Sequence, residues 1–264
     1  MKIFDAHVHI YPDKIAEKAS DTIGKFYDIN MTANGTINEL LTKCDNNGIE
    51  KCLVHSVATT HEQVVKINDF IIGSVKENPD RFVGFCTLHP SMDVKETEAE
   101  IERIIAAGLK GIKLHPDFQK FNIDDKHAME LYEVIDGRVP ILFHIGDERY
   151  EFSLPEKLCA AAKRFPNQVM IGAHLGGYQR WESGVKCLVG LPNVYVDESS
   201  SLPFLTPEKA KEYITAFGTD RVFFGTDYPM WDEKSELERF DRLDFGDNDR
   251  EKILYKNISA LLGV

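Results

Sequence analysis

Two histidines near the start of the chain, His7 and His9, are separated by a single residue. The apolar residues around them predict a buried strand over Ile3–Ile10. Because side chains alternate along a strand, we expect Asp5, His7 and His9 to share one face. Neutral imidazoles in that arrangement can bind one ion of zinc or of a neighbouring transition metal. Two ligands do not complete a metal site, so the rest of the chain must supply others.

A simpler interpretation of His7 and His9 is a pair of polar residues at an exposed strand end. The apolar neighbours Phe4 and Val8 argue against it, because a buried imidazole without a partner is costly. The pair alone does not decide between the two interpretations, whereas the positions of further ligands do.

The composition limits the classes of partner. The chain has 264 residues and a formal net charge of −12. An acidic surface disfavours general binding to nucleic acids or to anionic membranes, so we expect a small-molecule substrate. Neither a signal peptide nor an apolar run of membrane-spanning length is apparent. The five cysteines lack Cys-x-x-Cys spacing, and we expect reduced thiols in a cytoplasmic protein. The oligomeric state, including a homo-oligomer, stays open.

Short apolar runs alternate with amphipathic stretches of helical period along the chain. The runs predict eight strands: Ile3–Ile10, Lys51–Val57, Phe82–Leu88, Gly111–His115, Pro140–Ile145, Val169–His174, Val194–Val196 and Val222–Gly225. The stretches between them predict helices near Asp13–Gly24, Ile37–Cys44, His61–Glu77, Val94–Ala107, Asp125–Ile135, Pro155–Arg164, Gln179–Leu188 and Pro207–Phe217, with more helix at the C-terminus. Eight such units in one uninterrupted chain predict an α/β fold, a single-domain (β/α)8 TIM barrel over residues 1–264. An open doubly wound sheet is the alternative.

Most of the histidines fall where the predicted strands end. Seven of the nine histidines lie at or near the carboxyl end of a strand: His7, His9, His55, His89, His115, His144 and His174. Asp227 follows the eighth strand in the same way. In a TIM barrel the catalytic groups lie at this end of the strands. In a protein without such a site, we would expect histidines to be scattered over helix faces. The observed pattern therefore predicts that these side chains converge on one site.

Five motifs carry a family resemblance: Asp5-Ala6-His7-Val8-His9, Gly111-Ile112-Lys113-Leu114-His115-Pro116, Phe143-His144-Ile145-Gly146, Gly172-Ala173-His174-Leu175-Gly176-Gly177 and Gly225-Thr226-Asp227-Tyr228-Pro229. In this order they resemble the amidohydrolase superfamily, and most of all its amidohydrolase 2 branch. That branch includes decarboxylases of the aminocarboxymuconate semialdehyde type. The resemblance covers residues 5 to about 230 and rests on the whole set, because each motif alone is unspecific.

The resemblance implies a role for each of these side chains. His7, His9, His144 and Asp227 match metal ligands, and Asp227 also exchanges a proton with water on the metal. His174 matches the histidine that contacts the substrate or activates that water. Such ligands leave one position of a divalent ion open for water, whose pKa falls to about 7 on zinc in favourable cases. We expect one divalent ion, with zinc preferred; a second ion, bridged by a carbamylated Lys113 as in binuclear relatives, is the alternative.

Four further residues are candidates for substrate binding. Lys113 and His115 share a face of the fourth strand, and Arg149 and Arg180 lie in the loops after the fifth and sixth strands. Cationic side chains near a metal suit a substrate that carries a carboxylate. The alternatives are a buried ion pair for Lys113, a structural turn for His115 and surface ion pairs for the two arginines. The long segment 11–35 is a candidate for a lid or a subunit contact.

We therefore expect a metal-dependent hydrolase, in which a metal-activated water attacks an amide, lactone or related carbonyl of a small anionic substrate. Asp227 would act as the general base, and His174 would orient the substrate or stabilise the oxyanion. The first alternative is non-oxidative decarboxylation of an unsaturated or aromatic carboxylic acid, which uses the same ligands in the resembling branch. The second alternative is a non-catalytic metal-binding barrel. The sequence does not separate these three functions.

Overall fold

Eight parallel strands form one closed barrel in the computed structural model, which describes residues 1–264. The strands pair in chain order: β1 Phe4–His9, β2 Lys51–His55, β3 Phe82–Thr87, β4 Gly111–Leu114, β5 Ile141–Phe143, β6 Met170–Gly172, β7 Val194–Asp197 and β8 Val222–Phe223. Backbone hydrogen bonds close the ring, from Ala6 N to Phe224 O at 2.8 Å and from His9 N to Tyr228 O at 2.8 Å. The expected (β/α)8 barrel is confirmed, and the open sheet is excluded.

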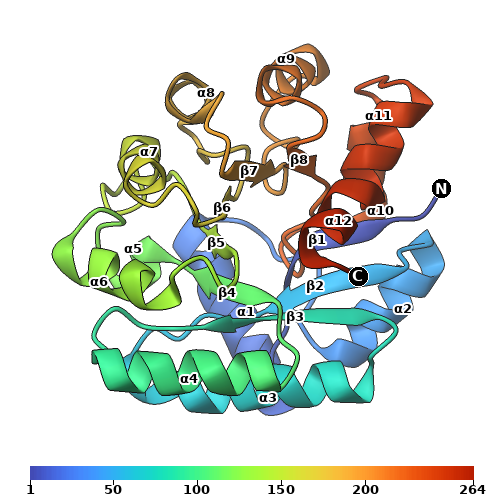
Figure 1. Ribbon diagram of the computed structural model, residues 1–264. Helices are drawn as coiled ribbons and strands as arrows, with labels where there is room; N and C mark the ends of the chain where they lie inside the picture. Colours follow the sequence, from blue (N-terminus) through green and yellow to red (C-terminus); the bar gives the residue numbers. More distant parts are fainter.

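The helices surround the strands (Figure 1). Their bounds are α1 Asp13–Tyr27, α2 Ile37–Asn47, η1 His61–Gln63, α3 Val64–Glu77, α4 Val94–Ala106, α5 Pro116–Gln119, α6 Lys126–Ile135, α7 Pro155–Arg164, α8 Trp181–Leu188, α9 Pro207–Phe217, α10 Glu233–Asp241, α11 Asp247–Glu251, η2 Lys252–Lys256 and α12 Asn257–Leu262. η1 is a 3₁₀ turn and η2 a π-helical turn. None of these helices has both the length and the apolar character needed to cross a bilayer.

The main difference from the predicted elements is the short helix α5, which follows β4 directly. The strand ends at Leu114, one residue earlier than expected, because His115 caps the helix. The His115 Nδ1 atom accepts a hydrogen bond from Phe118 N at 3.4 Å, and Pro116 occupies the first helical position. The His115 side chain is therefore fixed by the helix that it caps.

Apolar side chains fill the barrel interior on the side of the amino ends of the strands, which we call the lower interior. They form one cluster with two residues of α12: Phe4, Ala6, Leu53, Val83, Phe85, Leu142, Ile171, Ala173, Phe223, Ile258 and Leu262. Along a strand the residue two positions further faces the same side. Leu53 is followed in this way by His55, and Leu142 by His144. The interior thus changes from apolar to polar towards the carboxyl ends of the strands.

A bulge in β1 determines where the first two histidines point. The pairing with β2 shows one extra residue on β1 just after Asp5, which shifts the alternation of side chains. As a result Ala6, below the bulge, and His7 and His9, above it, all face the interior. The expectation that Asp5 shares their face is wrong. The Asp5 carboxylate instead accepts hydrogen bonds from Thr226 N at 3.0 Å and Thr226 Oγ1 at 2.6 Å, which ties β1 to the end of β8.

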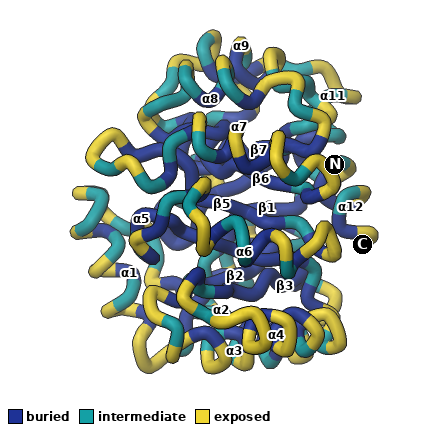
Figure 2. Tube along the Cα trace, turned by 60° about the vertical axis from the view of Figure 1, so that its left-hand side comes forward, coloured by how far each residue is buried: buried dark blue, intermediate teal, exposed yellow.

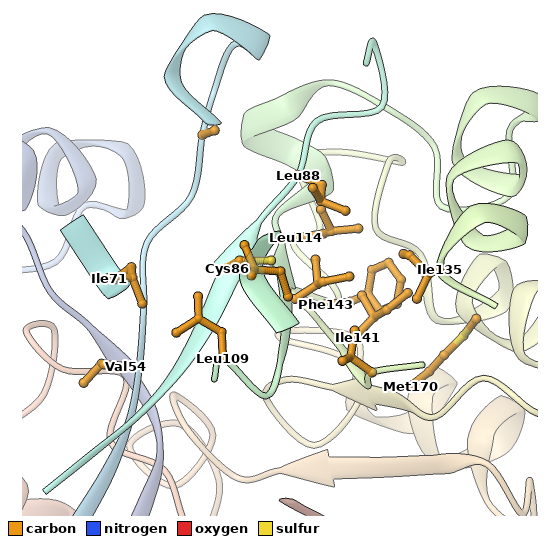
Figure 3. Packing of buried hydrophobic residues seen from close by; sticks show 14 of the residues in the cluster. Val54, Ile71, Cys86, Leu88, Leu109, Leu114, Ile135, Ile141, Phe143 and Met170 are labelled. Atoms are coloured by element: carbon orange, nitrogen blue, oxygen red, sulfur yellow. The ribbon is translucent and has the colours of Figure 1, made fainter. Parts of the chain in front are cut away.

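A second apolar layer separates the strands from the helices. Its side chains come from both partners, as Figure 3 shows for Phe143 and Ile141 of β5 beside Ile135 of α6. Figure 2 shows the same division along the chain, with buried strands inside and exposed outer surfaces on the helices. This layer holds the strand ends, and therefore the polar side chains on them, in fixed positions.

Tyr132 on α6 is fully buried in this layer, and its hydroxyl has no hydrogen-bond partner. A buried polar group without a partner costs about 1–3 kcal/mol. We therefore expect Tyr132→Phe to leave the free energy of unfolding unchanged or to raise it by about 1 kcal/mol. Tyr228→Phe is the matched control, because the Tyr228 hydroxyl donates to Thr36 O at 3.2 Å, and it should lower that energy by about 1 kcal/mol. Urea unfolding measures both, and a greater loss for Tyr132→Phe would contradict the expectation.

A buried carboxyl group on α10 makes the stability depend on pH. Burial raises the pKa of Glu236 to about 7, although Arg239 donates to its Oε1 atom at 2.5 Å. Because this pKa lies above that of the unfolded chain, the group's stabilising contribution is complete below about pH 4 and is lost as the pH rises through 7. Glu236→Gln should remove that loss. Between pH 5 and pH 8 the wild type should lose about 2 kcal/mol of unfolding free energy relative to the variant. An equal difference at both pH values would rule out this role.

Candidate functional site

A small cavity lies at the carboxyl ends of the strands, above the apolar interior. Its volume of about 30 Å³ has room for one or two water-sized groups but not for an aromatic ring. The strand ends contribute His7, His9, Lys113, His115, His144, His174 and Asp227, and the segment that contains α1 contributes Tyr11, Ile23, Tyr27 and Met31. The structure thus brings together all five residues expected as ligands or catalytic groups and two of the four substrate-binding candidates, Lys113 and His115. Part of the segment 11–35 forms a wall of the cavity.

The carboxylate of Asp227 lies between the first two histidines. Asp227 Oδ1 is 3.5 Å from His7 Nε2 and 3.5 Å from His9 Nε2. The other oxygen, Oδ2, accepts a hydrogen bond from Ser200 Oγ at 2.6 Å, and Trp231 Nε1 donates to the same hydroxyl at 2.9 Å. The side chain therefore presents one oxygen to the histidines while the other is held in place.

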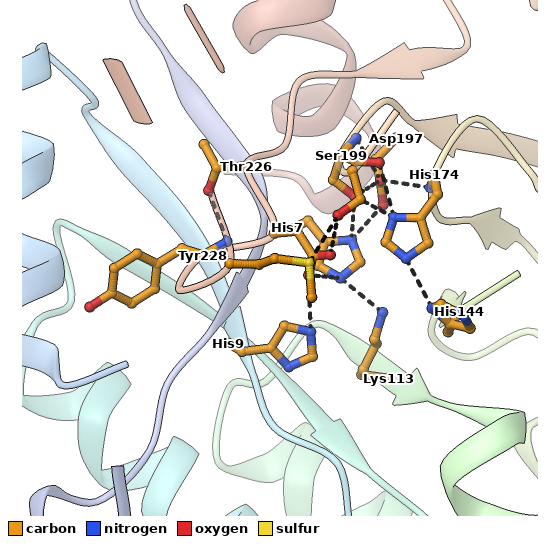
Figure 4. A network of polar contacts seen from close by, with 12 residues as sticks. His7, His9, Lys113, His144, His174, Asp197, Ser199, Thr226 and Tyr228 are labelled. Carbon is orange, nitrogen blue, oxygen red and sulfur yellow. Dashed lines mark hydrogen bonds and ion pairs between the residues drawn. The ribbon is translucent and has the colours of Figure 1, made fainter. Parts of the chain in front are cut away.

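Asp197, at the end of β7, orients the His7 ring. Its Oδ2 atom lies 3.0 Å from His7 Nδ1 (Figure 4). An ionised carboxylate only accepts hydrogen bonds, so His7 carries its proton on Nδ1 and has a lone pair on Nε2. Lys113 Nζ is 3.0 Å from that Nε2 atom and donates to it. A carboxylate behind a histidine in this way is a common arrangement in metal sites, where it fixes the ring and its tautomer.

A second series of hydrogen bonds, through His174, sets the tautomer of His144. His174 Nδ1 lies 3.0 Å from the Ser199 carbonyl oxygen, which can only accept. His174 Nε2 therefore accepts, and His144 Nδ1 donates to it at 3.0 Å. This leaves a lone pair on His144 Nε2, which is buried and forms no hydrogen bond, with Asp117 Oδ2 the nearby polar atom at 3.5 Å. Both nitrogens of His174 are thus engaged, which differs from the expectation that this ring contacts the substrate or a water.

Burial keeps these imidazoles neutral. It lowers the pKa of His7 and of His9, and it lowers the pKa of His174 to about 4. Burial alone would raise the pKa of Asp227, but His7, His9 and His174 hold it well below its usual range. An ionised carboxylate among neutral imidazoles is the charge state that a metal site requires.

Lys113 is the one cationic side chain that lines the cavity. The ammonium group is almost fully buried, and burial lowers its pKa to about 8, although Asp197 and Asp227 act in the opposite direction. His115, on the other side, stacks between Phe118 and His144 with ring centroids 3.8 Å and 4.0 Å apart. Tyr27 on α1 reaches His115 Nε2 through its hydroxyl at 3.0 Å. Lys113 therefore supplies charge, while His115 forms part of an aromatic wall.

The two arginines expected to bind substrate lie outside the cavity. Arg149 forms an ion pair with Asp147 at 2.6 Å and lies 4.5 Å from the centre of the Phe26 ring. Arg180 donates to the backbone oxygens of Asp147 and Glu148. Their guanidinium groups tie loops together in this structure, and their contact with a substrate stays a prediction.

Two of the cavity residues adopt left-handed backbone conformations. The φ angle is 61° at His174 and 58° at Asp227. Residues other than glycine seldom adopt this region, which occurs at helix ends as well as in active sites. The turn after β8 packs closely against β1 at Gly225. Any larger residue there would place its Cβ atom only 2.9 Å from the Cβ of His7, so the position requires glycine.

Sequence reasoning missed several residues that shape the site. Asp197 and Ser199 orient His7 and His174, yet their only sequence signal is their position directly after the seventh strand. His55, one of the strand-end histidines, is fully buried and has no partner on either ring nitrogen. One of its nitrogens lies within 4.8 Å of a nitrogen of His7 and of His9. The barrel register pairs it with His9.

The donor atoms fit a divalent first-row metal ion. His7 Nε2 presents a lone pair, and so does His144 Nε2, which lies 3.5 Å from Asp117 Oδ2 and groups with His115 and Asp117. Asp227 Oδ1 adds an anionic oxygen beside His7 and His9. Nitrogen and carboxylate oxygen ligands suit zinc, manganese or iron rather than calcium or magnesium. The geometry therefore passes this test for a metal site.

Three known proteins are similar to this chain. The 2-amino-3-carboxymuconate-6-semialdehyde decarboxylase of Dictyostelium discoideum is 26% identical over 200 residues, which are 62% of this chain and 55% of that protein. An uncharacterized TIM-barrel protein from Bordetella bronchiseptica has a TM-score of 0.83 at 21% identity, covering 100% of this chain and 99% of that one. The 5-carboxyvanillate decarboxylase of Novosphingobium aromaticivorans, solved with manganese and 4-hydroxy-3-methoxy-5-nitrobenzoic acid, has a TM-score of 0.76 at 15% identity, covering 99% and 96%.

The two solved structures support the barrel fold, and the match to the curated relative extends over about half of its length. The family model described as amidohydrolase matches residues 4–264 of this chain. That span includes every motif on which the resemblance rests. The chain therefore belongs to the amidohydrolase 2 family.

Proposed function

We propose that this protein is a metal-dependent enzyme that removes carbon dioxide, without oxidation, from a small aromatic or unsaturated carboxylic acid. Two of the similar proteins are decarboxylases, and one of them was solved with an aromatic acid, which favours this function over hydrolysis. The observation that carries the proposal is the cavity itself. It combines an ionised Asp227, neutral histidines and the buried ammonium group of Lys113 in a space that admits one or two water-sized groups.

We infer that His7, His9, His144 and Asp227 hold one divalent ion. The Novosphingobium relative contains manganese, so the expectation of zinc widens to manganese or zinc. When bound, the ion would anchor an anionic oxygen of the substrate and stabilise the negative charge that develops as carbon dioxide leaves. His7 Nε2 cannot bind an ion while Lys113 Nζ donates to it. Lys113 must therefore turn away from His7, which frees its ammonium group for the substrate.

The side chains of the cavity divide the remaining tasks. Lys113 supplies the positive charge that holds a substrate carboxylate. In decarboxylation the bond to the carboxylate carbon breaks, and the carbon left behind keeps the electron pair and gains a proton. Asp227 is the proton carrier: it takes a proton from the substrate or solvent and passes it to that carbon. His174 positions His144 through the 3.0 Å contact between them and is not itself a proton carrier.

Hydrolysis remains the second candidate, because the matching family is described as amidohydrolase. An ionised Asp227 beside a metal could equally take the proton of an attacking water. The third expectation, a non-catalytic metal-binding barrel, fits less well with a cavity that opens beside the candidate ligands. The products distinguish decarboxylation from hydrolysis.

The first test is a product assay on protein loaded with manganese or zinc. A panel of aromatic and unsaturated carboxylic acids, amides and lactones is incubated with the protein, and released carbon dioxide is measured against product mass. We expect one carbon dioxide for each acid consumed and a product shorter by that carboxyl group. A product that keeps every carbon and gains a water would instead establish hydrolysis.

Asp227→Asn tests the proton carrier. Loss of a positioned acid–base group lowers rates by about 10²–10⁴-fold, and we expect kcat to fall in this range, while the substrate still binds. Asp136→Asn is the matched control, because Asp136 is an exposed residue at the end of α6, outside the cavity. Because Asp227 is also a proposed ligand, steady-state kinetics compare both variants at saturating manganese and at equal measured metal content. A kcat for Asp227→Asn within a few-fold of the wild type would remove Asp227 from the mechanism.

Asp197→Asn tests the metal site without removing a ligand. An amide in place of the carboxylate weakens the hold on His7 Nδ1, and loss of such a partner typically costs about 10–100-fold in metal affinity. Glu198→Gln is the matched control, since Glu198 is the next residue, equally buried, and its carboxyl oxygens have no hydrogen-bond partner. Competition with a chelating dye measures the Kd for zinc and manganese. Equal metal affinity in both variants would mean that His7 is not a ligand.

A further inference from the structure

A larger groove opens beside the inner cavity, between α1, α3 and α5. This outer groove has a volume of about 620 Å³, which is in the range of small-molecule sites. It shares four lining residues with the inner cavity: His9, Tyr11, Ile23 and Phe118. The inner cavity has no room for a ring, so the bulk of any substrate whose carboxylate enters it must lie in the outer groove.

The walls of the outer groove are apolar along most of their length. α1 contributes Ile15 and Phe26, and α3 contributes Ile67 and Phe70. Ile15 is 51% exposed, so this wall presents apolar surface to the groove. Such walls favour an aliphatic or aromatic extension of the ligand, because its burial releases water from both surfaces.

Three lysines surround the outer groove, one on each of its elements. Lys18 lies on α1, Lys66 on α3 and Lys120 at the end of α5, and all three are exposed. None of them forms an ion pair with a carboxylate. The only acidic residue in the lining is Asp117, which is buried and accepts a hydrogen bond from Ser153 Oγ at 2.6 Å.

This local positive charge contrasts with the rest of the chain. Lysine and arginine number 31 against 43 aspartate and glutamate residues, which gives the net charge of −12. A groove of the opposite sign concentrates anions that the remaining surface repels. Charge and shape together thus select a ligand that is apolar in its middle and anionic at its outer end.

We propose that the outer groove is a binding subsite for the distal part of the substrate, and that the substrate is an amphipathic acid. Its reacting carboxylate enters the inner cavity, its apolar extension lies between α1 and α3, and a second anionic group, a carboxylate or a phosphate, is bound by Lys18, Lys66 and Lys120. The placement of the reacting carboxylate rests on the proposed function. The existence of the subsite does not, because binding measurements alone can test it.

The test uses three fluorescent probes that share one apolar chain: 11-(dansylamino)undecanoate, the corresponding undecyl phosphate and the neutral undecanol. Kd is measured by dansyl fluorescence on the full-length protein. We expect both anionic probes, or one of them, to bind at least about tenfold more tightly than the alcohol. The tighter anion identifies the outer group as carboxylate or phosphate. Equal affinity for all three probes would overturn the proposal.

Variants in which glutamine replaces the groove lysines test where the anionic group of the probe binds. The triple variant Lys18→Gln, Lys66→Gln, Lys120→Gln should weaken the preferred anionic probe about tenfold and leave the alcohol within about twofold. The control triple Lys14→Gln, Lys76→Gln, Lys95→Gln removes the same charge from exposed lysines outside the groove and should change neither. Ile15→Gln should weaken all three probes. An equal loss of anion binding in both triple variants would reduce the effect to net charge and overturn the subsite.

Three further outcomes separate this proposal from its rivals. If a second copy of the chain fills the groove, light scattering will show a dimer that the Lys18, Lys66, Lys120 variant dissociates, and the subsite proposal is then wrong. A protein that binds the anionic probes selectively but decarboxylates no acid keeps the subsite and loses the proposed function. A protein that decarboxylates small acids but binds all probes equally keeps the function and loses the subsite.

Discussion

The structure depends on an ionised carboxylate buried among neutral imidazoles. Asp227 is only 8% exposed, yet its pKa is held well below the usual range by the histidines around it. An ionised group removed from water is tolerated only when other groups replace the lost hydration. Ser200 and Trp231 do so for one oxygen, whereas the oxygen that faces His7 and His9 is 3.5 Å from each. This incomplete compensation is what a bound cation would complete.

The barrel provides this arrangement by stacking two kinds of layer. Apolar residues such as Leu53 and Leu142 fill the lower interior, and the residues two positions further along the same strands are polar. The apolar layer keeps water from the underside of the site, which strengthens every electrostatic interaction above it. The bulge in β1 adds the one local irregularity, since it turns both His7 and His9 inwards. Partners in the surrounding loops then fix the tautomers of the rings.

Much of this could be predicted from the sequence, because the signals are periodic or positional. Alternation of apolar runs and amphipathic stretches predicts the barrel, and the barrel places His144 and Asp227, 83 positions apart, at the same end. The face of β1 on which Asp5 lies could not be predicted, because a β-bulge leaves no mark in the apolar pattern of the sequence. The roles of Asp197 and Ser199 depend on hydrogen-bond partners from other strands. The ion pair of Arg149 could not be predicted either, because its partner Asp147 lies in the same loop and leaves no signal in the sequence pattern.

The central claim is that one divalent ion lies between His7, His9, His144 and Asp227. Anomalous diffraction at the manganese edge, from crystals grown with manganese chloride, measures this directly. The account predicts a single strong peak within bonding distance of His7 Nε2, His9 Nε2, His144 Nε2 and Asp227 Oδ1, with Lys113 turned away from His7. A map without a peak there, in which Lys113 still donates to His7 at saturating manganese, would contradict it.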